Sequence, residues 1–301
     1  MEKICAVVVT YEPSFVRLAE LLTSLWPQVD GLVIVDNASS QAPSETMLPQ
    51  LKCFKRCHIV ALAVNVGLAA GQNEGCYWAR TNGFSHVLLL DQDSVPGPSM
   101  VRRLLDKEQQ LLSQGVSVAV VAPQCRDDRN DSILPFFKIG YCRVTKLFCP
   151  GDCADERNCY PDFVISSGSL IRLSVLGEVG LFDEALFIDS VDVEWCYRAA
   201  NEGYQSVGVF AAVLNHRIGD QVVIFFGGKL VIYQHSPQRL RYMMRNRIWL
   251  YRKRYIPLRW KLNDIPRMLA KFLIFTLVIW PRGKNCRAML QGFRQGCGVR
   301  R

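Results

Sequence analysis

Short apolar runs alternate with segments of helical apolar spacing through the first half of the chain, and this alternation constrains the fold most. Five runs read as buried strands: Ile4–Val9, Leu32–Val35, His58–Leu62, Val87–Leu90 and Val116–Ala122. Between them, residues 14–26, 69–82 and 99–114 have helical spacing, with Ser14 and Ser99 as expected N-caps. Strands that alternate with helices predict an α/β fold with a largely parallel sheet.

The pattern changes after residue 123. Residues 124–161 lose their periodicity and collect cysteines and turn formers, which predicts a long surface excursion of the kind that contacts a substrate. Order returns with a predicted helix from about Val191 to Glu202 and a strand over Ser206–Leu214. Glu194 and Arg198 stand four residues apart on that helix, a spacing that favours an ion pair.

The charge of the chain is concentrated at its C-terminal end. Residues 236–301 hold 17 Lys and Arg and the single acid Asp264, a net charge of +16. The first 235 residues therefore carry −7 of the chain's overall +9. A basic segment attached to a mildly acidic body predicts an anionic partner for that segment alone.

The basic segment also contains one intense apolar run, Met268–Trp280. Its 13 residues fall short of the roughly 20 that cross a bilayer as a helix, so we expect attachment to a membrane surface. Trp260 and Trp280 at the edges and the neighbouring Arg and Lys suit the interfacial zone. Two alternatives remain. One is a pair of packed helices, and the other is a nucleic-acid binder whose stacking residues would be Trp249, Tyr251, Tyr255 and Trp260.

The N-terminus and the cysteines indicate a cytosolic body. Met1–Lys3 is followed by only six apolar residues, too few for the core of a signal peptide. Cys5, Cys76 and Cys196 lie inside apolar patterns, as expected of buried free thiols in a reducing compartment. The group Cys149, Cys153 and Cys159 lacks the paired spacing of a zinc site, and we expect a loop with free thiols there.

Two carboxylates follow the fourth predicted strand. Asp91 and Asp93 stand directly after Val87–Leu90, where a parallel strand reaches the sheet edge that hosts ligands. A turn formed by Ser94, Pro96 and Gly97 would bring both toward one Mg²⁺ or Mn²⁺, which prefer oxygen ligands. Such an ion would bridge the phosphates of a nucleoside diphosphate. Taken alone, Asp-x-Asp is more often a solvated turn.

Two further strands end in polar residues at the same edge. Thr10 and Tyr11 follow the first strand, and Asp36 follows the second. Asp36 could accept the N3–H of a uracil or thymine, while Tyr11 packs on the ring. The alternative for Asp36 is a helix cap or turn.

Glycines recur every four residues from Gly67 to Gly75 after Asn65, which marks one helix face and differs from a dinucleotide fingerprint. A face without side chains allows close approach of a backbone or a ligand. We expect ligand approach at Gly67 and packing at Gly75.

These motifs together resemble the inverting glycosyltransferases of family 2, whose nucleotide-binding α/β domain is called GT-A. The motifs that follow the family's order are Val9-Thr10-Tyr11, Val35-Asp36-Asn37, Asn65-Val66-Gly67, Asp91-Gln92-Asp93, Ser167-Gly168-Ser169, Phe187–Arg198 and His216. The resemblance covers about residues 4–217. It implies a GT-A catalytic domain over 1–235, with a nucleotide-binding half (1–123) and an acceptor-binding half (124–235), and a helical C-terminal extension over 236–301.

The resemblance also assigns roles. It places the catalytic base at Asp192, and it places His216 with Asp93 at the metal and diphosphate, leaving Asp91 to contact the donor's ribose or sugar. The family usually has Glu directly before this base, whereas Val191 stands here and Asp189 lies upstream. Asp189 is therefore either catalytic or the N-cap of the helix. His235 is a rival metal ligand.

Finer motifs look most like bacterial rhamnosyltransferases: Leu90–Ser94 with Gln92, Phe187–Asp189, and His235-Ser236-Pro237 followed by Arg239, Tyr242, Arg245 and Asn246. This implies a dTDP-L-rhamnose donor, a lipid-linked saccharide acceptor in O-antigen or capsule assembly, and a location at the cytoplasmic membrane face, with no nucleic acid as a partner. A UDP-sugar donor is the nearest alternative. A sugar nucleotidyltransferase is less well supported, because such enzymes need a glycine-rich basic loop where this chain has Tyr11-Glu12-Pro13.

Overall fold

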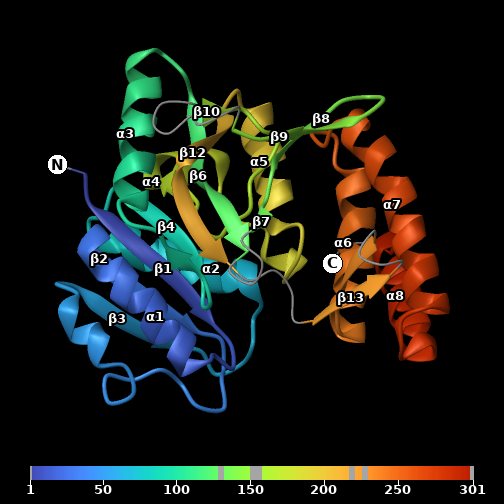
Figure 1. The fold of residues 1–301 in the computed structure, drawn as a ribbon, viewed down its shortest axis with the longest axis horizontal. Coiled ribbons are helices and arrows are strands. Elements are labelled where there is room, and N and C mark those ends of the chain that lie inside the picture. The colour runs from blue at the N-terminus through green and yellow to red at the C-terminus, as the bar shows by residue number, and fades with distance from the viewer. Residues whose placement is uncertain (1, 128–131, 150–157, 217–220, 226–229, 299–301) are drawn as a thin grey trace.

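A computed structural model describes residues 2–127, 132–149, 158–216, 221–225 and 230–298, and for 216, 221–225 and 230–233 it describes the backbone alone. Its centre is a 10-stranded sheet, drawn at the left of Figure 1. The strands of the main path run in the order β10-β12-β6-β11-β4-β1-β2-β3. Their bounds are β1 Ile4–Thr10, β2 Gly31–Asp36, β3 Cys57–Ala61, β4 His86–Asp91, β6 Val118–Asp127, β10 Asn158–Cys159, β11 Leu170–Arg172 and β12 Gln205–His216.

Most neighbours in this sheet are parallel. β1 pairs in parallel with both β2 and β4, β2 with β3, and β6 with β12. β11 is inserted antiparallel between β4 and β6. The short strands β5 (Val95–Pro96) and β7 (Ser132–Ile133) pair with β12 and β6. The carboxyl ends of β1, β2 and β4 therefore meet at one edge, as the sequence predicts.

Helices cover both faces of the sheet. One face packs against α1 (Phe15–Leu25) and α3 (Met100–Ser113), and the other against α2 (Leu68–Thr81), α4 (Leu173–Val179) and α5 (Val191–Asn201). Successive residues of β1 alternate between these two cores, because neighbouring side chains of a strand point to opposite faces. Three 3-10 helices complete the body: η1 Trp26–Gln28, η2 Pro49–Cys53 and η3 Glu184–Leu186.

The α/β fold and every predicted strand and helix of the body are confirmed, with ends that move by a few residues. Ser14 and Ser99 hold the N-cap positions of α1 and α3, but neither side chain makes a capping hydrogen bond. The predicted pair of Glu194 and Arg198 forms, with Nη2 3.0 Å from Oε2. Close packing explains the helical glycines: a Cβ at Gly75 would lie 2.2 Å from Val7 Cγ1.

The excursion predicted over 124–161 is more regular than its sequence suggested. β6 continues to Asp127, and a separate hairpin joins β8 (Phe136–Ile139) to β9 (Val144–Leu147). Residues 128–131 and 150–157, with Cys153, lie outside the described part of the chain. Cys5, Cys76 and Cys196 are buried free thiols, and burial raises the pKa of the latter two to about 12.

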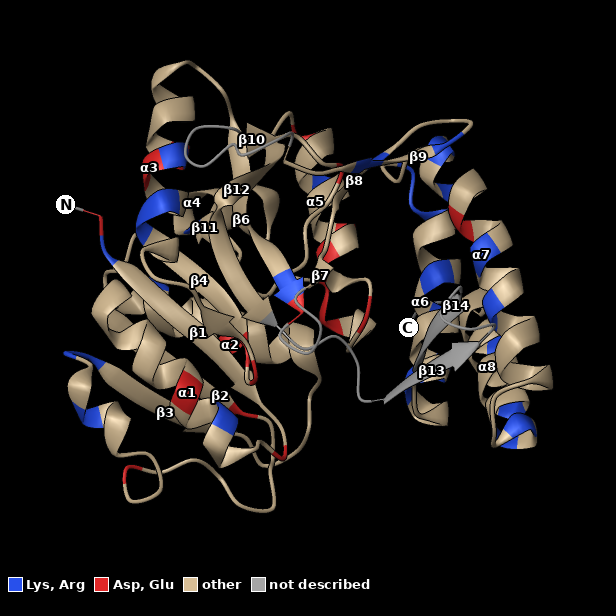
Figure 2. Ribbon diagram, viewed as in Figure 1, with Lys and Arg blue, Asp and Glu red and all other residues tan. Residues whose placement is uncertain are grey.

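The C-terminal helices form a second unit beside the body (Figure 1). α6 spans Pro237–Arg252, α7 Leu258–Leu277 and α8 Arg282–Cys297, and a hairpin of β13 (Gln221–Phe225) and β14 (Leu230–Gln234) precedes them. Their own core consists of Leu240, Met244, Met268, Phe275, Ile279 and Met289. Figure 2 shows blue Lys and Arg spread along these helices. Within the described residues, no helix is both long enough and apolar enough to cross a membrane.

The run Met268–Trp280 packs on one side only. Met268 and Phe275 are buried against α6 and α8, whereas Leu269, Leu273 and Trp280 are exposed. Packing inside the protein and a free apolar face therefore coexist in α7.

The C-terminal unit is also joined to the body. Leu250, Ile256 and Trp260 belong to the same hydrophobic core as Trp195 of α5. Trp260 is therefore a core residue and not the interfacial tryptophan that we expected. The other three proposed stacking residues, Trp249, Tyr251 and Tyr255, pack against this core as well, which removes the observation that favoured nucleic-acid binding.

Candidate active site

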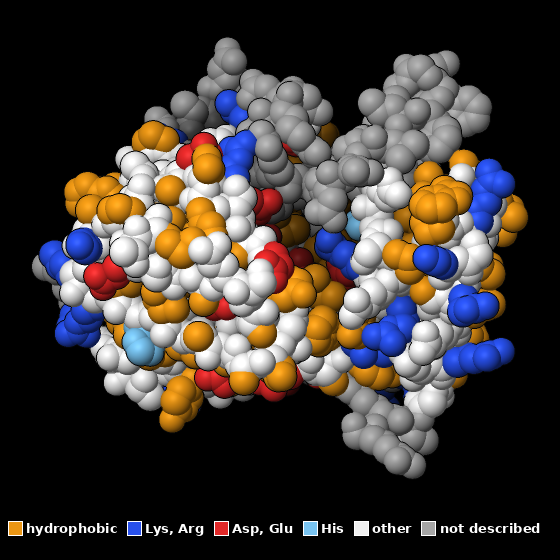
Figure 3. Space-filling view, turned by 90° about the horizontal axis from the view of Figure 1, so that it is seen from below, with side chains coloured by type: hydrophobic (Ala, Val, Ile, Leu, Met, Phe, Trp, Pro, Cys, Tyr) orange, Lys and Arg blue, Asp and Glu red, His pale blue; other side chains and the backbone are white. Residues whose placement is uncertain are grey.

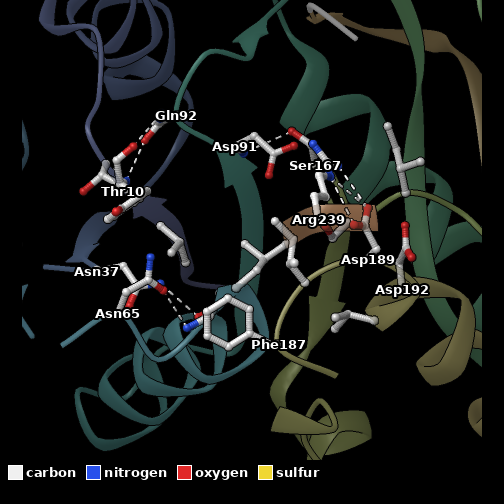
Figure 4. A pocket seen from close by; sticks show the side chains of 18 of the residues that line it. Thr10, Asn37, Asn65, Asp91, Gln92, Ser167, Phe187, Asp189, Asp192 and Arg239 are labelled. Carbon is white, nitrogen blue, oxygen red and sulfur yellow. Dashed lines mark hydrogen bonds and ion pairs between the residues drawn. The ribbon is translucent and has the colours of Figure 1, made fainter. Parts of the chain in front are cut away.

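A cavity of about 510 Å³ opens at the carboxyl edge of β1 and β4. Figure 3 shows acidic side chains beside a hollow between the body and the C-terminal helices. Figure 4 shows the lining from close by, with Thr10, Asn37 and Asn65 on one side and Asp189, Asp192 and Arg239 on the other. The lining also includes Val9, Tyr11, Gly67, Leu68, Asp91, Gln92, Asp93, Ile165, Ser166, Ser167, Phe187, Ile188, Ser190 and Val191.

The ends of β1 and β4 are tied together by Gln92. Its Oε1 accepts from the Tyr11 backbone N–H at 2.8 Å, and its Nε2 donates to the Tyr11 carbonyl at 3.2 Å. The Tyr11 ring is about half exposed and borders the cavity. Gln92 thus fixes the strand ends that carry Thr10 and Asp91.

Asp36 lies behind the wall of the cavity and does not line it. Its carboxylate is only 2% exposed and accepts hydrogen bonds from the Thr10 hydroxyl at 2.8 Å and from the hydroxyl and N–H of Ser39 at 2.6 and 3.0 Å. Pairing with a nucleobase would require some of these bonds to be exchanged. In this conformation Asp36 holds Thr10 and the turn at Ser39, which matches the turn that we weighed against base recognition.

Asn37 and Asn65 shape the loop that leads into α2. Asn37 accepts from the Val66 N–H at 2.8 Å and donates to the Gly67 carbonyl at 3.1 Å, while Asn65 Oδ1 accepts from the Gly67 N–H at 3.0 Å. Gly67 has a φ of 90°, and a Cβ there would lie 2.6 Å from the Phe187 ring. Both the backbone conformation and the packing on Phe187 require glycine. Gly67 thus packs on Phe187 and also lines the cavity, and ligand approach at this glycine stays a prediction.

Asp91 and Asp93 both line the cavity at the end of β4. The Asp91 N–H donates to Ser167 Oγ at 3.1 Å, and Ser167 Oγ lies 2.7 Å from Ser94 Oγ, so these hydroxyls fix the turn that carries both carboxylates. In the described part of the chain, no three His, Cys, Asp or Glu side chains gather closely enough to hold a metal. Two carboxylates nevertheless suit Mg²⁺ or Mn²⁺ bound partly by substrate phosphates, because such ions keep few protein ligands in nucleotide sites.

His216 is the last residue of β12 and pairs with Asp127 through its backbone. Its side chain lies outside the described part of the structure, so its predicted place at the metal stays a prediction. The ring of His235, the rival ligand, stacks on Phe275 of the C-terminal core with centroids 6.2 Å apart.

Asp192 stands in the first turn of α5 and faces the cavity. Burial raises the pKa of its carboxyl to about 6, the Val193 N–H lowers it, and the carboxylates of Asp189 and Asp91 raise it further. A carboxylate with this pKa is mostly ionised at pH 7 and can accept a proton, which is the property of a general base. Asp91, at the end of β4, lines the same cavity as Asp192.

Asp189 forms an ion pair with Arg239 of α6 and is not the N-cap of α5, a position that Ser190 holds. Arg239 Nη2 lies 3.0 Å from Asp189 Oδ1, and Nε lies 3.1 Å from Oδ2. The expected alternative of a capping role for Asp189 is therefore wrong. The two residues are 50 positions apart, and only the fold brings them together.

The backbone before Asp192 is strained. Phe187 has φ 65° and ψ −66°, and the Ile188 N–H donates to the Leu186 carbonyl at 2.7 Å, which defines a γ-turn centred on Phe187. Asp189 and Ser190 then both adopt φ 65°. Such conformations cost about 1–3 kcal/mol each and cluster at functional sites.

Sequence reasoning did not name four polar lining residues as parts of the site: Asn37, Ser166, Ser167 and Ser190. Two of them, Asn37 and Ser167, also hold neighbouring backbone by hydrogen bonds. Both occur in motifs quoted for the resemblance, but neither carries a charge that suggests chemistry. In this structure they hold the neighbouring backbone in place. A polar residue at a position where the apolar pattern predicts burial is the signal that could have found them.

The mixed sheet, with paired carboxylates at the end of β4 and a buried carboxylate at the start of α5 lining one cavity, has the arrangement expected of a GT-A glycosyltransferase. The family model described as "Glycosyl transferase family 2" matches residues 5–172. The chain therefore belongs to glycosyl transferase family 2 and is a glycosyltransferase.

A curated relative supports the same conclusion over a longer stretch. The "dTDP-rhamnosyl transferase RfbF" of Shigella flexneri is 31% identical over 280 residues, which make up 92% of this chain and 88% of that protein.

Two solved structures share the fold. GalNAc-T7, with UDP, GalNAc and Mn²⁺, has a TM-score of 0.62 at 14% identity, and the match covers 90% of this chain. This chain spans about half, 51%, of the GalNAc-T7 chain. Residues 1–349 of S. aureus TarS, in complex with UDP-GlcNAc, have a TM-score of 0.58 at 15% identity, covering 96% of this chain and 81% of that one.

Proposed function

We propose that this glycosyltransferase transfers L-rhamnose from dTDP-L-rhamnose to a hydroxyl of a lipid-linked oligosaccharide, with inversion at the sugar carbon. The observation that carries the donor is the 31% identity to a dTDP-rhamnosyl transferase over nearly the whole chain. A UDP-sugar is the alternative donor, favoured by the fold shared with proteins bound to UDP and UDP-GlcNAc.

In this mechanism Asp192 removes the proton from the acceptor hydroxyl. The hydroxyl oxygen then attacks the sugar carbon from the side opposite the diphosphate, and the bond from that carbon to the phosphate oxygen breaks. With a pKa of about 6, Asp192 is mostly ionised at pH 7. Its pKa is also close enough to the pH of the reaction for efficient proton transfer. The ion pair with Arg239 partly neutralises Asp189, which lets two carboxylates stand side by side.

The donor diphosphate lies at Asp91 and Asp93 in this proposal. Asp93 and His216 would hold Mg²⁺ or Mn²⁺, while Asp91 would contact the donor's ribose or sugar. The ion would neutralise the charge that develops on the leaving diphosphate. Thr10, Tyr11, Asn65 and Gly67 line the side of the cavity that receives the nucleotide.

The lipid part of the acceptor accounts for the exposed face of α7. Apolar side chains recur there every three or four residues and form a stripe along the helix: Leu258, Leu262, Ile265, Leu269, Leu273 and Leu277, exposed by 37–64%. Trp280, which follows the helix, is 79% exposed. A stripe of this kind on a strongly basic unit fits the surface of an anionic membrane. We therefore place the enzyme at the cytoplasmic membrane face, where its acceptor is anchored.

A panel of nucleotide sugars tests the donor. We expect dTDP-L-rhamnose with Mn²⁺ or Mg²⁺ to raise the melting temperature more than UDP-glucose, UDP-GlcNAc or GDP-mannose does at the same concentration. A ligand that binds only the folded state stabilises it more the tighter it binds. Stronger stabilisation by a UDP-sugar would contradict the dTDP-L-rhamnose donor and support a UDP-sugar donor. Transfer to a lipid-diphosphate saccharide, followed by mass spectrometry, then identifies the sugar that moves.

A further inference from the structure

One side chain of α6 holds the backbone turn that precedes Asp192. Asn246 is fully buried, and its Nδ2 lies 2.8 Å from the carbonyl oxygens of Leu186 and Ile188 and 2.9 Å from that of Asp189. An amide nitrogen carries two hydrogens, so three carbonyls share them. Every donor of this side chain is directed at one turn of the catalytic body.

Arg245 fixes the orientation of that amide. Its Nε and Nη2 donate to Asn246 Oδ1 at 3.0 and 2.9 Å. A guanidinium has no acceptor, so the amide oxygen must face Arg245 and the nitrogen must face the carbonyls. Nη2 also donates to the carbonyls of Ala185 and Leu186 at 2.7 and 3.0 Å, which extends the support along the turn.

The turn needs this support because of its backbone. It contains the γ-turn at Phe187 and the two positive φ angles that follow. Such a backbone persists only where its surroundings over-determine it. Helix α5 begins directly after it, with the Glu194 N–H bonded to the Ser190 carbonyl, so the place of the turn sets the place of Asp192.

The same turn reaches the donor side of the cavity. The Phe187 carbonyl accepts from the N–H groups of Leu68 and Ala69 at 2.6 and 3.3 Å, and its ring packs on Gly67 and stacks on Tyr242 of α6 at 4.7 Å. A shift of the turn would therefore move the donor wall and the base together (Figure 4).

We propose that Asn246, oriented by Arg245, is a positioning residue for the transfer reaction: it fixes residues 185–190 so that Asp192 meets the acceptor hydroxyl. The inference rests on the proposed function, because it takes Asp192 as the base. Asn246 itself does not line the cavity and acts only through the turn.

The chain offers a matched control in Asn285 of α8. Asn285 is also buried, and its Nδ2 donates to the carbonyls of Phe275 and Ile279 at 3.2 and 3.0 Å, within the C-terminal core. Asn246→Ala and Asn285→Ala each remove a buried amide that binds backbone carbonyls. Both should lower the melting temperature, but only the first should disturb the site.

The test measures kcat, the donor KM and the pH profile of both variants at a temperature at which both are folded. For Asn246→Ala we expect a fall in kcat of roughly 100-fold, as a misplaced catalytic group produces, a displaced acid limb of the pH profile, and a smaller change in KM. For Asn285→Ala we expect kcat within about twofold of the wild type. Equal kcat and equal pH profiles in the two variants would overturn the proposal.

A second variant and a choice of donor keep the test decisive. If Asn246→Ala does not fold, Arg245→Met removes the orienting donors but keeps the aliphatic stem, and should lower kcat with the same displaced acid limb; an unchanged kcat and acid limb would count against the proposal. If the wild type uses a sugar other than rhamnose, the donor proposal fails, while the comparison is simply run with that sugar.

A measurement that needs no sugar transfer tests the same placement of Asp192 when no active donor and acceptor pair is available. The effect of Asp192→Asn on the melting temperature at pH 8, relative to pH 4, reports how strongly the site perturbs Asp192. This effect should shrink when Asn246→Ala is also present and persist beside Asn285→Ala. An equal effect in both backgrounds would show that Asn246 does not place Asp192.

Discussion

At the scale of single residues, the site works by setting the environment of one carboxyl group. Asp192 is enclosed by the start of α5 and faces Asp189 and Asp91, and these surroundings raise its pKa to about 6. Arg239 limits the repulsion by pairing with Asp189. A base at this pKa gives activity that falls as pH drops through 6, since protonation removes the acceptor of the hydroxyl proton.

The raised pKa of Asp192 predicts a stabilising but inactivating substitution. In the wild type, ionisation of Asp192 is harder in the folded than in the unfolded state, so stability is lost as pH rises from about 4 through 6. Asp192→Asn avoids this loss. We expect it to abolish transfer and yet to increase the free energy of unfolding by about 2 kcal/mol at pH 8, at about 1.4 kcal/mol per pKa unit with some screening by water.

Chemical unfolding of the protein without substrate at pH 8 and pH 4 checks this expectation. The gain should be nearly absent at pH 4, where the carboxyl is protonated when folded. Asp106→Asn, at an exposed position of α3, should change stability little at either pH. Normal turnover by Asp192→Asn would remove this residue from its role as base.

Asp93 gives a prediction about the metal. Asp93→Ala should weaken donor binding in the presence of Mn²⁺ by tenfold or more, roughly the loss of one ligand from a site with few protein ligands. It should have little effect on donor binding in EDTA. Isothermal titration with dTDP under both conditions makes the comparison, and equal affinities for wild type and variant in Mn²⁺ would contradict the assignment.

Sequence patterns identify the residues of the site better than their contacts. Asp91 and Asp93 stand at a strand end, and local pattern is enough to place them at the sheet edge. Asp192 followed from the resemblance to the family. The pair of Asp189 and Arg239 and the enclosure of Asp36 depend on side chains that meet across 50 and 26 positions, through the fold alone. Local pattern cannot tell that the carboxylate of Asp36 is enclosed whereas that of Asp91 lines the cavity.

At the scale of elements, α7 combines two roles that its sequence could not separate. The apolar run was too short to span a membrane and too uniform to show which face is buried. The structure divides it: Met268 and Phe275 enter the C-terminal core, and Leu269, Leu273 and Trp280 remain outside. The strands and helices of the body, by contrast, follow directly from period, because each has a core on one or both faces.

The exposed stripe of α7 predicts how the protein binds membranes. Leu269→Glu with Leu273→Glu should reduce binding to vesicles containing anionic lipid by at least tenfold, since each buried leucine contributes about 1.5–3 kcal/mol. The melting temperature and the transfer to a water-soluble acceptor analogue should change little. Vesicle co-sedimentation measures the loss, with Val16→Glu at an exposed position of α1 as the control. Unchanged vesicle binding would contradict a role of these exposed side chains in membrane attachment.

At the scale of the whole molecule, the C-terminal unit completes the catalytic body. A boundary at residue 235 separates an acidic part of the chain from a basic part. It does not separate two hydrophobic cores, because one core contains residues from both parts. Leu250, Ile256 and Trp260 enter the core of the body, while α6 supplies Arg239 to the cavity and Asn246 to the turn before the base. A substrate bound in the cavity would therefore contact both units.

This shared core predicts that the two units unfold together. Two tryptophans provide the comparison: Trp260 is 7% exposed in the shared core, and Trp280, which lies between α7 and α8, is 79% exposed. Trp260→Ala should lower stability by about 3–5 kcal/mol, a large part of the roughly 5–15 kcal/mol that holds a domain folded. Trp280→Ala should change stability by no more than about 0.5 kcal/mol.

Calorimetry should show one transition for the full chain, and in Trp260→Ala that whole transition should move to lower temperature. A fragment of residues 1–235 that melts near the wild-type temperature and still binds dTDP would contradict this coupling, because such a fragment lacks every C-terminal residue of the shared core.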